Sequence, residues 1–287
     1  MTKRLLGCCA RMPPPARIPA PCTPPVSPLT PPPEPPAGHS LLAGKTVLVT
    51  AAAGAGIGFA TAWRCAQEGA KVAISDIHER RLNEAANRLA EVMGEPPLAV
   101  LCNVTVEPEV QTMIDATVER YGQLDVLVNN AGLGGETSIL EMTDEQWLTV
   151  LDVTLNGTFR CTRAALRHMT ARGSGVIVNN ASVIGWRAQA GQAHYSAAKA
   201  GVMALTRAAA MDVAGSGVRV NAVAPSIAIH EHLAKVSTPE FLEQLASREA
   251  FGRAAAPWEV ATVIAFLASD YSTYMTGEVV SVSSQHP

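Results

Sequence analysis

The chain has 287 residues, of which 48% are hydrophobic and 16% charged. That size can bury one substantial core, so we expect one folded domain of about 250 residues. The formal net charge of −3 gives no electrostatic reason for binding nucleic acid or an anionic membrane. No apolar run reaches the roughly 18 residues of a membrane span, and the basic start is followed by too short an apolar run for a secretory signal. We therefore expect a cytoplasmic protein without a membrane partner.

The six cysteines show no C-x-x-C spacing. Three of them, Cys65, Cys102 and Cys161, fall singly within periodic segments. Reduced thiols are the simplest interpretation of this pattern, because metal and redox sites need closely paired cysteines.

Thirteen of the twenty prolines lie in the first 40 residues. Proline removes a backbone donor and fixes φ, so such a segment forms neither a regular helix nor a paired strand. We predict a disordered or polyproline-like tail over residues 1–40. It is either a dispensable extension or a docking site for proline-binding modules.

From Leu41 the pattern changes to short apolar runs that alternate with helical segments. Strands are predicted at 45–50, 71–75, 98–102 and 124–130, and helices at 57–67, 78–92 and 107–120. Strands that are separated by helices of ten to fifteen residues indicate a parallel sheet covered on both faces.

The alternation continues with a long helix near 152–170, a strand at 175–180 and a helix carrying Tyr195 and Lys199. A strand at 218–224, a helix at 257–267 and a last strand near 278–283 complete the set. Seven strands in this order predict an α/β, Rossmann-like, doubly wound parallel sheet. Residues 41–287 would form this single domain, and residues 225–252, which break the rhythm after a strand end, would form a substrate lid.

A glycine-rich loop follows the first strand and opens the first helix. Such a loop lets backbone N–H groups and the positive helix end approach a pyrophosphate. Asp76 follows eighteen residues after Gly58, where a carboxylate can bind both adenosine ribose hydroxyls and repel a 2′-phosphate. We therefore predict NAD, with NADP not excluded because His78, Arg80 and Arg81 follow closely. The candidate loop residues are Thr50, Gly54, Gly56, Ile57 and Gly58.

Two further strand ends carry small or polar residues. Asn130, Ala131 and Gly132 end the fourth strand with "NNAG", where the chain can pass close to a ligand. Ser182 follows the fifth strand, thirteen residues before Tyr195. Tyr195 and Lys199 are four residues apart, so a helix places them on one face.

These motifs together resemble the short-chain dehydrogenase/reductase family over about residues 41–284. The resemblance implies that Tyr195 is the general acid/base, that Ser182 binds the substrate oxygen, and that Lys199 holds the nicotinamide ribose and lowers the pKa of the phenol. Lowering that pKa from about 10 to about 7 requires about 4 kcal/mol, and an exposed ion pair supplies at most about 1 kcal/mol. We therefore expect Lys199 in a water-poor crevice.

The chain departs from the family pattern at four places. The usual T-G-x-x-x-G-x-G loop is one residue longer here and lacks its first glycine. Asn103 and Val104 stand where the family usually contacts adenine with Asp-Val. Thr154 replaces the asparagine that helps to hold a relay water, and we expect its hydroxyl to bind water instead. After Pro225, Ser226 replaces the glycine of the usual Pro-Gly, and the threonine that meets the carboxamide in the family has no counterpart before Thr238.

The predicted lid carries His230, His232 and Lys235. We expect no metal there, because no further ligand has matching spacing. Cations on this segment suit an anionic substrate such as a coenzyme A thioester, and an exposed amphipathic helix is the alternative. Its apolar residues would line a hydrophobic crevice: Ile227, Ile229, Leu233, Phe241 and Leu245.

Segments such as "TAAAGAGIG", "APSIAIHEHLAKV" and "GEVVSVSSQHP" resemble the bacterial steroid-catabolism branch of this family. The resemblance implies oxidoreduction of a bicyclic indane carboxyl-CoA and a homotetramer or homodimer. A fatty-acid type 3-oxoacyl thioester reductase is the alternative, and a nicotinamide-binding sensor without catalysis is a more remote one.

Overall fold

The computed structural model describes residues 32–229, 243, 246–247 and 249–285. Within this part the chain forms one seven-stranded parallel sheet of order β3-β2-β1-β4-β5-β6-β7. The predicted doubly wound parallel sheet is therefore confirmed. The strands are β1 Thr46–Val49, β2 Lys71–Asp76, β3 Leu98–Leu101, β4 Val126–Asn129, β5 Gly175–Asn180, β6 Val218–Pro225 and β7 Val279–Val282.

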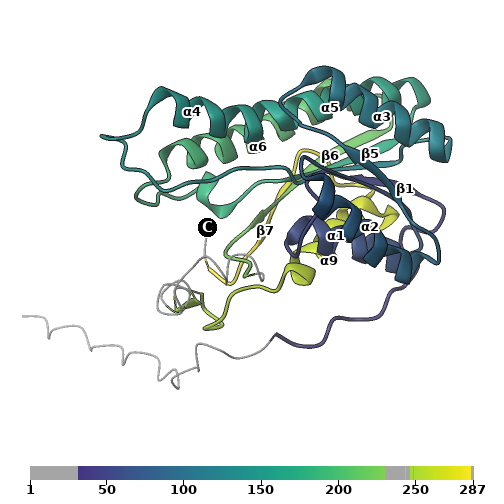
Figure 1. Ribbon diagram of the computed structural model, residues 1–287, viewed down its shortest axis with the longest axis horizontal. Coiled ribbons are helices and arrows are strands. Elements are labelled where there is room, and N and C mark those ends of the chain that lie inside the picture. The colour runs from purple at the N-terminus through teal and green to yellow at the C-terminus, as the bar shows by residue number, and fades with distance from the viewer. Residues whose placement is uncertain (1–31, 230–242, 244–245, 248, 286–287) are drawn as a thin grey trace, which may run out of the picture.

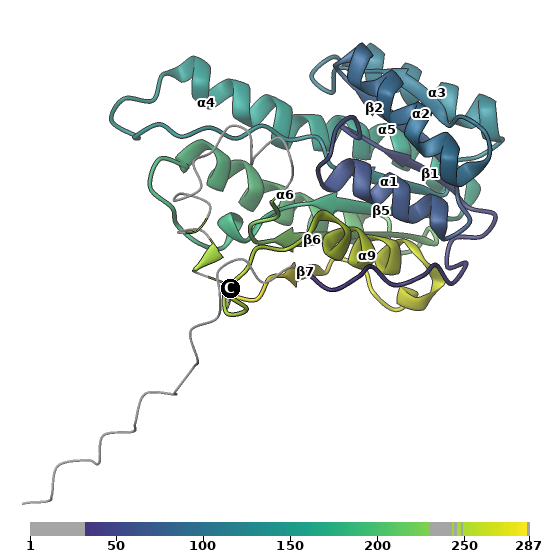
Figure 2. The ribbon, with the colours of Figure 1, turned by 60° about the horizontal axis from the view of Figure 1, so that its bottom comes forward.

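Helices cover both faces of the sheet (Figures 1 and 2). α1, α2 and α9 lie on one face, and α3, α4, α5 and α6 lie on the other. The helices of the two layers are α1 Ile57–Gln67, α2 Glu79–Met93, α3 Glu107–Tyr121, α4 Asp144–Leu151, α5 Gly157–Arg172, α6 Ala193–Asp212 and α9 Pro257–Ala268.

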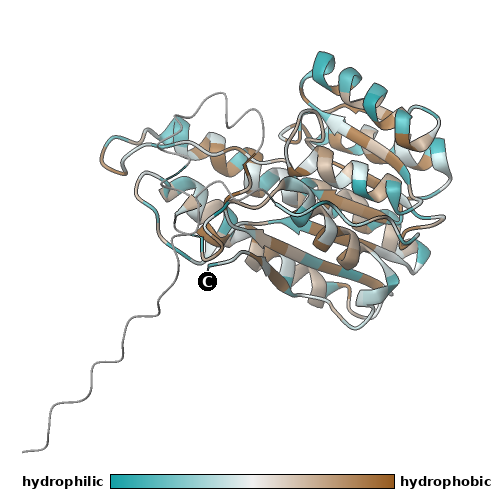
Figure 3. Ribbon diagram, turned by 90° about the horizontal axis from the view of Figure 1, so that it is seen from below, coloured by the Kyte–Doolittle hydropathy of each residue, from teal (hydrophilic) through white to brown (hydrophobic). Residues whose placement is uncertain are grey.

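Each helical layer packs its own apolar core against the sheet. One core joins Leu82 and Leu89 of α2 to Ile264 of α9 and to the strands, and the other centres on Met113, Leu127 and Met169. The strands are predominantly hydrophobic in Figure 3, as expected for strands buried on both faces. The three described cysteines are free and buried within these cores, where burial raises the pKa of each thiol.

The long helix of the second layer begins earlier than the pattern indicated. We predicted its start near Asp152, whereas α4 begins at Asp144. Thr143 caps it, since its hydroxyl accepts from Gln146 N and the Gln146 side chain accepts from Thr143 N. This reciprocal capping box is readable in the sequence as T-D-E-Q. A π-helical segment, Asp152–Asn156, then joins α4 to α5.

A strap formed by residues 35–41 lies along α1. Arg64 donates to Pro36 O at 2.6 Å and to Ala37 O at 3.4 Å. Glu68, which pairs with Arg64, accepts from His39 N at 2.8 Å and from Leu41 N at 3.0 Å. Ordered contacts therefore reach into the segment 1–40, and a tail boundary at residue 40 stays a prediction, as do the single domain 41–287 and the lid.

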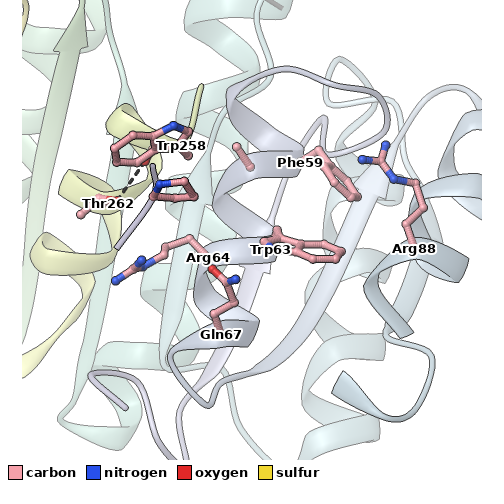
Figure 4. Close-up of a pocket in the computed structure, with 9 residues that line it drawn as sticks. Phe59, Trp63, Arg64, Gln67, Arg88, Trp258 and Thr262 are labelled. Carbon is pink, nitrogen blue, oxygen red and sulfur yellow. Dashed lines mark hydrogen bonds between the residues drawn. The ribbon is translucent and has the colours of Figure 1, made fainter. Parts of the chain in front are cut away.

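Beside the strap is a groove of about 290 Å³ between α1, α2 and α9. Figure 4 shows Phe59, Trp63 and Gln67 on one side of α1, with Arg88 on α2 and Trp258 on α9 at its two ends. Arg88 lies 4.0 Å from the centre of the Phe59 ring. In the described part of the chain, no helix is long and apolar enough to cross a membrane.

Candidate active site

Four strands end at one edge of the sheet, and the residues that follow these strand ends form the site. Thr50 follows β1, Asn130 follows β4, Ser182 follows β5, and Ser226 follows β6. Thr50 Oγ1 accepts from Asn130 N at 2.9 Å and from Ala131 N at 3.1 Å. The predicted loop and the "NNAG" turn are therefore joined directly at the crevice where open α/β sheets bind ligands.

The glycine-rich loop is built for close approach to its neighbours. A Cβ on Gly58 would lie 2.4 Å from both Ala51 O and Asn130 Nδ2, so no larger residue fits there. Gly56 caps α1 without a side-chain hydrogen bond, which leaves the first backbone N–H groups of α1, at Ile57 and beyond, available to an anion. Gly54 has a φ of 126°, which glycine adopts without strain.

Ala51 stands where the family pattern has its first glycine, and it has a φ of 50°. The left-handed conformation costs an L-residue about 1–2 kcal/mol. This strain is the structural consequence of the missing glycine in the loop.

Ala51→Gly is expected to raise the free energy of unfolding by about 0.5–1 kcal/mol, because relief of left-handed strain exceeds the entropy cost of glycine. The midpoint of urea unfolding measures the change. Ala53→Gly, two residues on and without a positive φ, is the matched control and should lower stability. Shifts of the same sign in both variants would contradict the strain at Ala51.

Asp76 lies at the end of β2 with 7% of its surface exposed. Its carboxylate accepts from Ala53 N at 3.2 Å and from His78 N at 3.0 Å. Burial raises the pKa of this carboxyl, and the bond from Ala53 and the charge of Arg81 oppose that rise. The acid therefore contacts the glycine loop, as expected for a residue that faces the adenosine end of a dinucleotide.

Asn103 and Val104 follow the neighbouring strand end. Asn103 Oδ1 accepts from Thr105 N at 3.1 Å and from Thr105 Oγ1 at 2.9 Å, which closes a local turn. Val104 is buried, and its Cγ2 would be 2.7 Å from a Cβ on Gly157. The structure thus places both residues near the end of β3, with the Asn103 side chain already hydrogen bonded within its own turn.

Ser182, Tyr195 and Lys199 come together at the ends of β5 and α6. The Ser182 side chain interacts with the Tyr195 phenol and lowers its pKa, but burial is the larger effect and raises that pKa. In this structure the Ser182 hydroxyl donates its one proton to Pro225 O at 3.5 Å, and its oxygen accepts from Ile184 N at 3.3 Å. The structure therefore joins the predicted triad residues Ser182 and Tyr195 directly.

Lys199 is 3% exposed, so the expected water-poor crevice is present. Its Nζ donates to Asn180 O at 2.5 Å and lies 5.6 Å from the centre of the Tyr195 ring. Burial lowers the pKa of Lys199 to about 8. Burial raises the pKa of the Tyr195 phenol, and the lowering of that pKa by Lys199 stays a prediction.

Thr154 lies in the π-helical segment and is fully buried. Its hydroxyl accepts from Leu133 N at 2.9 Å and donates to Leu133 O at 3.1 Å. The donor is therefore used, and one acceptor lone pair is left for the expected water. The water contact stays a prediction. Single π turns inside α-helices frequently occur at functional sites.

The residues that follow β6 are hydrogen bonded, through Glu249, to a residue near the end of the chain. Ser226 Oγ donates to Glu249 Oε2 at 3.1 Å, and Ser284 Oγ donates to the same oxygen at 2.9 Å. Glu249 is 4% exposed and so fixes the start of the predicted lid. His230, His232, Lys235, Leu233, Phe241 and Leu245 lie outside the described residues.

Comparison with known proteins assigns this architecture to a family. The family model described as Enoyl-(Acyl carrier protein) reductase matches residues 51–284. The (5R,7aS)-5-hydroxy-7a-methyl-1-oxo-2,3,5,6,7,7a-hexahydro-1H-indene-carboxyl-CoA reductase of Mycobacterium tuberculosis is 62% identical over 252 residues, 88% of this chain and 96% of that protein. The chain belongs to the short-chain dehydrogenase/reductase family.

Other members of the short-chain dehydrogenase/reductase family agree in sequence and in structure. The 3-oxoacyl-(acyl-carrier-protein) reductase FabG of Thermotoga maritima is 40% identical over 84% of this chain and 97% of its own. The crystal structure of a short chain dehydrogenase from Mycobacterium smegmatis is 58% identical, covers 89% of this chain and 98% of its own, and has a TM-score of 0.79. The protein is therefore an oxidoreductase.

Members of the short-chain dehydrogenase/reductase family bind a nicotinamide dinucleotide, and this site fits one. The close approach at Gly58, the uncapped start of α1 and the buried Lys199 with a single hydrogen-bond acceptor among the described residues each suit that group. The loop and Asp76 would hold its pyrophosphate and adenosine, and Tyr195 and Lys199 would face its nicotinamide half.

The sequence interpretation missed two residues of this site. Asn180 holds Lys199 and also donates to Asn130 Oδ1 at 2.9 Å, and its signal was a second asparagine at a buried strand end. Glu249 had no signal, because an acid after a long irregular segment is ordinarily exposed.

Proposed function

We propose that this oxidoreductase interconverts a secondary hydroxyl and a ketone on a bicyclic hydroxy-methyl-oxo-indane carboxyl-CoA, with NAD(H) as its cofactor. The observation that carries the proposal is the 62% identity to the indene-carboxyl-CoA reductase over 96% of that protein. The steroid-ring substrate comes to this chain from that likeness.

In the proposed reaction Tyr195 moves the proton and the bound nicotinamide gives or takes the hydride. The phenol donates to the ketone oxygen in reduction and accepts from the hydroxyl in oxidation. Ser182, which interacts with the phenol, would bind the same oxygen.

A cavity of about 840 Å³ beside the start of α6 offers room for a bulky substrate. Residues 136–139, 141, 187–191, 193 and 196 line it. Its lining includes the exposed apolar Ile139, the acids Glu136 and Glu141, and Arg187, whose Nη2 is buried without a hydrogen-bond partner among the described residues. An apolar ring system with an anionic or thioester end matches such a lining, with Arg187 as its polar partner.

The proposed preference for NAD over NADP rests on Asp76. Its buried carboxylate lies at the adenosine end of the site, where a negative charge repels a 2′-phosphate. Arg81 is near enough to influence that carboxyl, so the preference depends on the balance between the two charges.

Asp76→Asn is expected to lower the ratio of kcat/KM with NAD to that with NADP about tenfold, which corresponds to about 1.4 kcal/mol of lost repulsion. The amide keeps one acceptor oxygen for Ala53 N, so the contact with the loop is retained while the bond from His78 N is lost. Glu79→Gln, which removes an exposed acid three residues on, is the control. An unchanged ratio in Asp76→Asn would refute the role of this carboxylate.

A 3-oxoacyl thioester reductase is the second candidate, favoured by the 40% identity to FabG of Thermotoga maritima. It shares the triad and differs in the acyl group and in the cofactor that Asp76 would accept. A sensor without turnover is the remaining alternative, although sensing alone requires none of Ser182, Tyr195 and Lys199.

The deciding experiment measures nicotinamide absorbance with purified enzyme, the oxo-indane carboxyl-CoA and a linear 3-oxoacyl-CoA, each with NADH and NADPH. Turnover confined to the bicyclic thioester with NADH is the expected result. Preference for the linear thioester would assign the enzyme to fatty-acid chemistry. Absence of turnover with both substrates, despite measurable NADH binding, would refute the thioester proposal.

The proposal also includes the oligomeric state of the enzyme and its cellular compartment. A homotetramer or homodimer would cover exposed apolar side chains of the long helices, Leu148 of α4 and Phe159 of α5. The free buried thiols agree with a reducing compartment such as the cytoplasm. Light scattering of the purified enzyme measures the number of subunits.

A further inference from the structure

Asn180, the last residue of β5, contacts both halves of the site. Its backbone oxygen accepts from Lys199 Nζ at 2.5 Å. Its side-chain Nδ2 donates to Asn130 Oδ1 at 2.9 Å. One residue therefore contacts both the lysine of the catalytic group and the turn after β4, which is hydrogen bonded to the glycine loop.

Asn130 transmits this contact to the loop. Its Nδ2 donates to Thr50 O at 3.2 Å and to Ala51 O at 3.0 Å. These two carbonyls accept only from the amide nitrogen, so Asn130 must present Oδ1 to Asn180. Asn180 must in turn present its Nδ2, and the orientation of both amides is fixed by the chain of bonds.

The hydrogen bonds from Asn130 reach the glycine loop at its strained residue. Ala51 adopts its left-handed conformation there, and a Cβ on Gly58 would be 2.4 Å from Asn130 Nδ2. A shift of the Asn130 side chain would therefore change both the turn at Ala51 and the space beside the start of α1.

The side-chain oxygen of Asn180 makes an unfavourable contribution to stability. Asn180 Oδ1 is buried and has no hydrogen-bond partner among the described residues. An unpaired buried acceptor is unfavourable, and an apolar side chain of similar size would avoid it. The bond from Nδ2 to Asn130 is the compensation that the structure shows.

We propose that Asn180 is a positioning residue for the dinucleotide, whose side chain sets the glycine loop through Asn130. Its backbone oxygen sets Lys199 independently of the side chain. The inference rests on the family's nicotinamide cofactor and not on the proposed thioester substrate, because its test measures binding without any substrate.

The test is the dissociation constant for NADH, measured by nicotinamide fluorescence with the full chain. Asn180→Leu removes the donor at similar size, and Asn180→Asp keeps the shape but leaves two acceptors facing each other. Both are expected to weaken NADH binding about tenfold or more, as for a lost polar anchor. At saturating NADH the loss in kcat of Asn180→Leu should be smaller than its loss in NADH affinity, since the oxygen that holds Lys199 belongs to the backbone.

A double-mutant cycle with Asn130→Ala separates positioning from a structural effect. If the contact acts as proposed, Asn180→Leu adds little to the NADH dissociation constant once Asn130 is alanine. Additive effects would overturn the proposal. So would a lower melting temperature with unchanged NADH affinity, or a loss in kcat of Asn180→Leu that is larger than its loss in NADH affinity.

Discussion

Tyr195→Phe is expected to lower kcat by about 10²- to 10⁴-fold, the usual contribution of a positioned general acid or base. The substitution removes only the hydroxyl that shares a hydrogen bond with Ser182. The ring keeps its place beside Lys199 and Gly134, so the dissociation constant for NADH should stay nearly the same. Single-turnover kinetics and a fluorescence titration measure the two quantities separately.

Tyr274→Phe is the matched control for this prediction. Tyr274 is fully exposed, so loss of its hydroxyl should leave both kcat and NADH binding unchanged. If Tyr195→Phe retained more than a few per cent of the wild-type kcat, Tyr195 would not be the group that transfers the proton.

Lys199→Met is expected to stabilise the cofactor-free protein while it removes most of the activity. Lowering the lysine pKa from 10.5 to about 8 by burial corresponds to about 3 kcal/mol of unfavourable free energy for the charged form. Removing the lysine also removes its hydrogen bond to Asn180 O, and this loss offsets about 1 kcal/mol of the gain in stability. At pH 7 the variant should therefore be about 2 kcal/mol more stable than the wild type.

The sign of the pH dependence follows from the depressed pKa of this base. Between pH 8 and 10.5 the unfolded wild type binds more protons than the folded one, so wild-type stability rises with pH in this window. The advantage of Lys199→Met should be complete below pH 8 and disappear above pH 10.5. Denaturant unfolding at several pH values measures it.

Loss of the lysine should also weaken NADH binding about tenfold, since a buried charged donor with free N–H groups is removed, and lower kcat at least about a hundredfold. Lys45→Met, at a partly exposed lysine paired with Asp270, is the control for both. A Lys199→Met protein less stable than the wild type at pH 7 would show that the lysine is not buried as a charge.

Local patterns in the chain predict most of the fold. The start and end of α1 agree with the predicted 57–67, because a glycine cap precedes an apolar period of 3.6 residues. The strands agree within a few residues because their apolar runs are buried on both faces. The early start of α4 was missed although the T-D-E-Q capping box at Thr143 marks it in the sequence.

The site could be predicted less completely than the fold. Ser182, Tyr195, Lys199 and Asp76 stand at strand ends or on one helix face, so their spacing alone brings them to one edge. The pKa of Tyr195 could not be predicted, because it depends on how far the phenol is buried. Nor could the role of Asn180, which depends on the parallel register of β4 and β5, where Asn129 pairs with Asn179 and the next residues meet.

The strap along α1 determines where a shortened chain can begin. Arg64 and Glu68 are buried, at 5% and 0% exposure, and four hydrogen bonds from them reach residues 36–41. A protein started at Leu41, the position that the change in sequence pattern indicates, would lose three of these and open the ion pair to water. Truncation for expression or crystallisation should therefore stop before Pro35, so that the whole strap along α1 is kept.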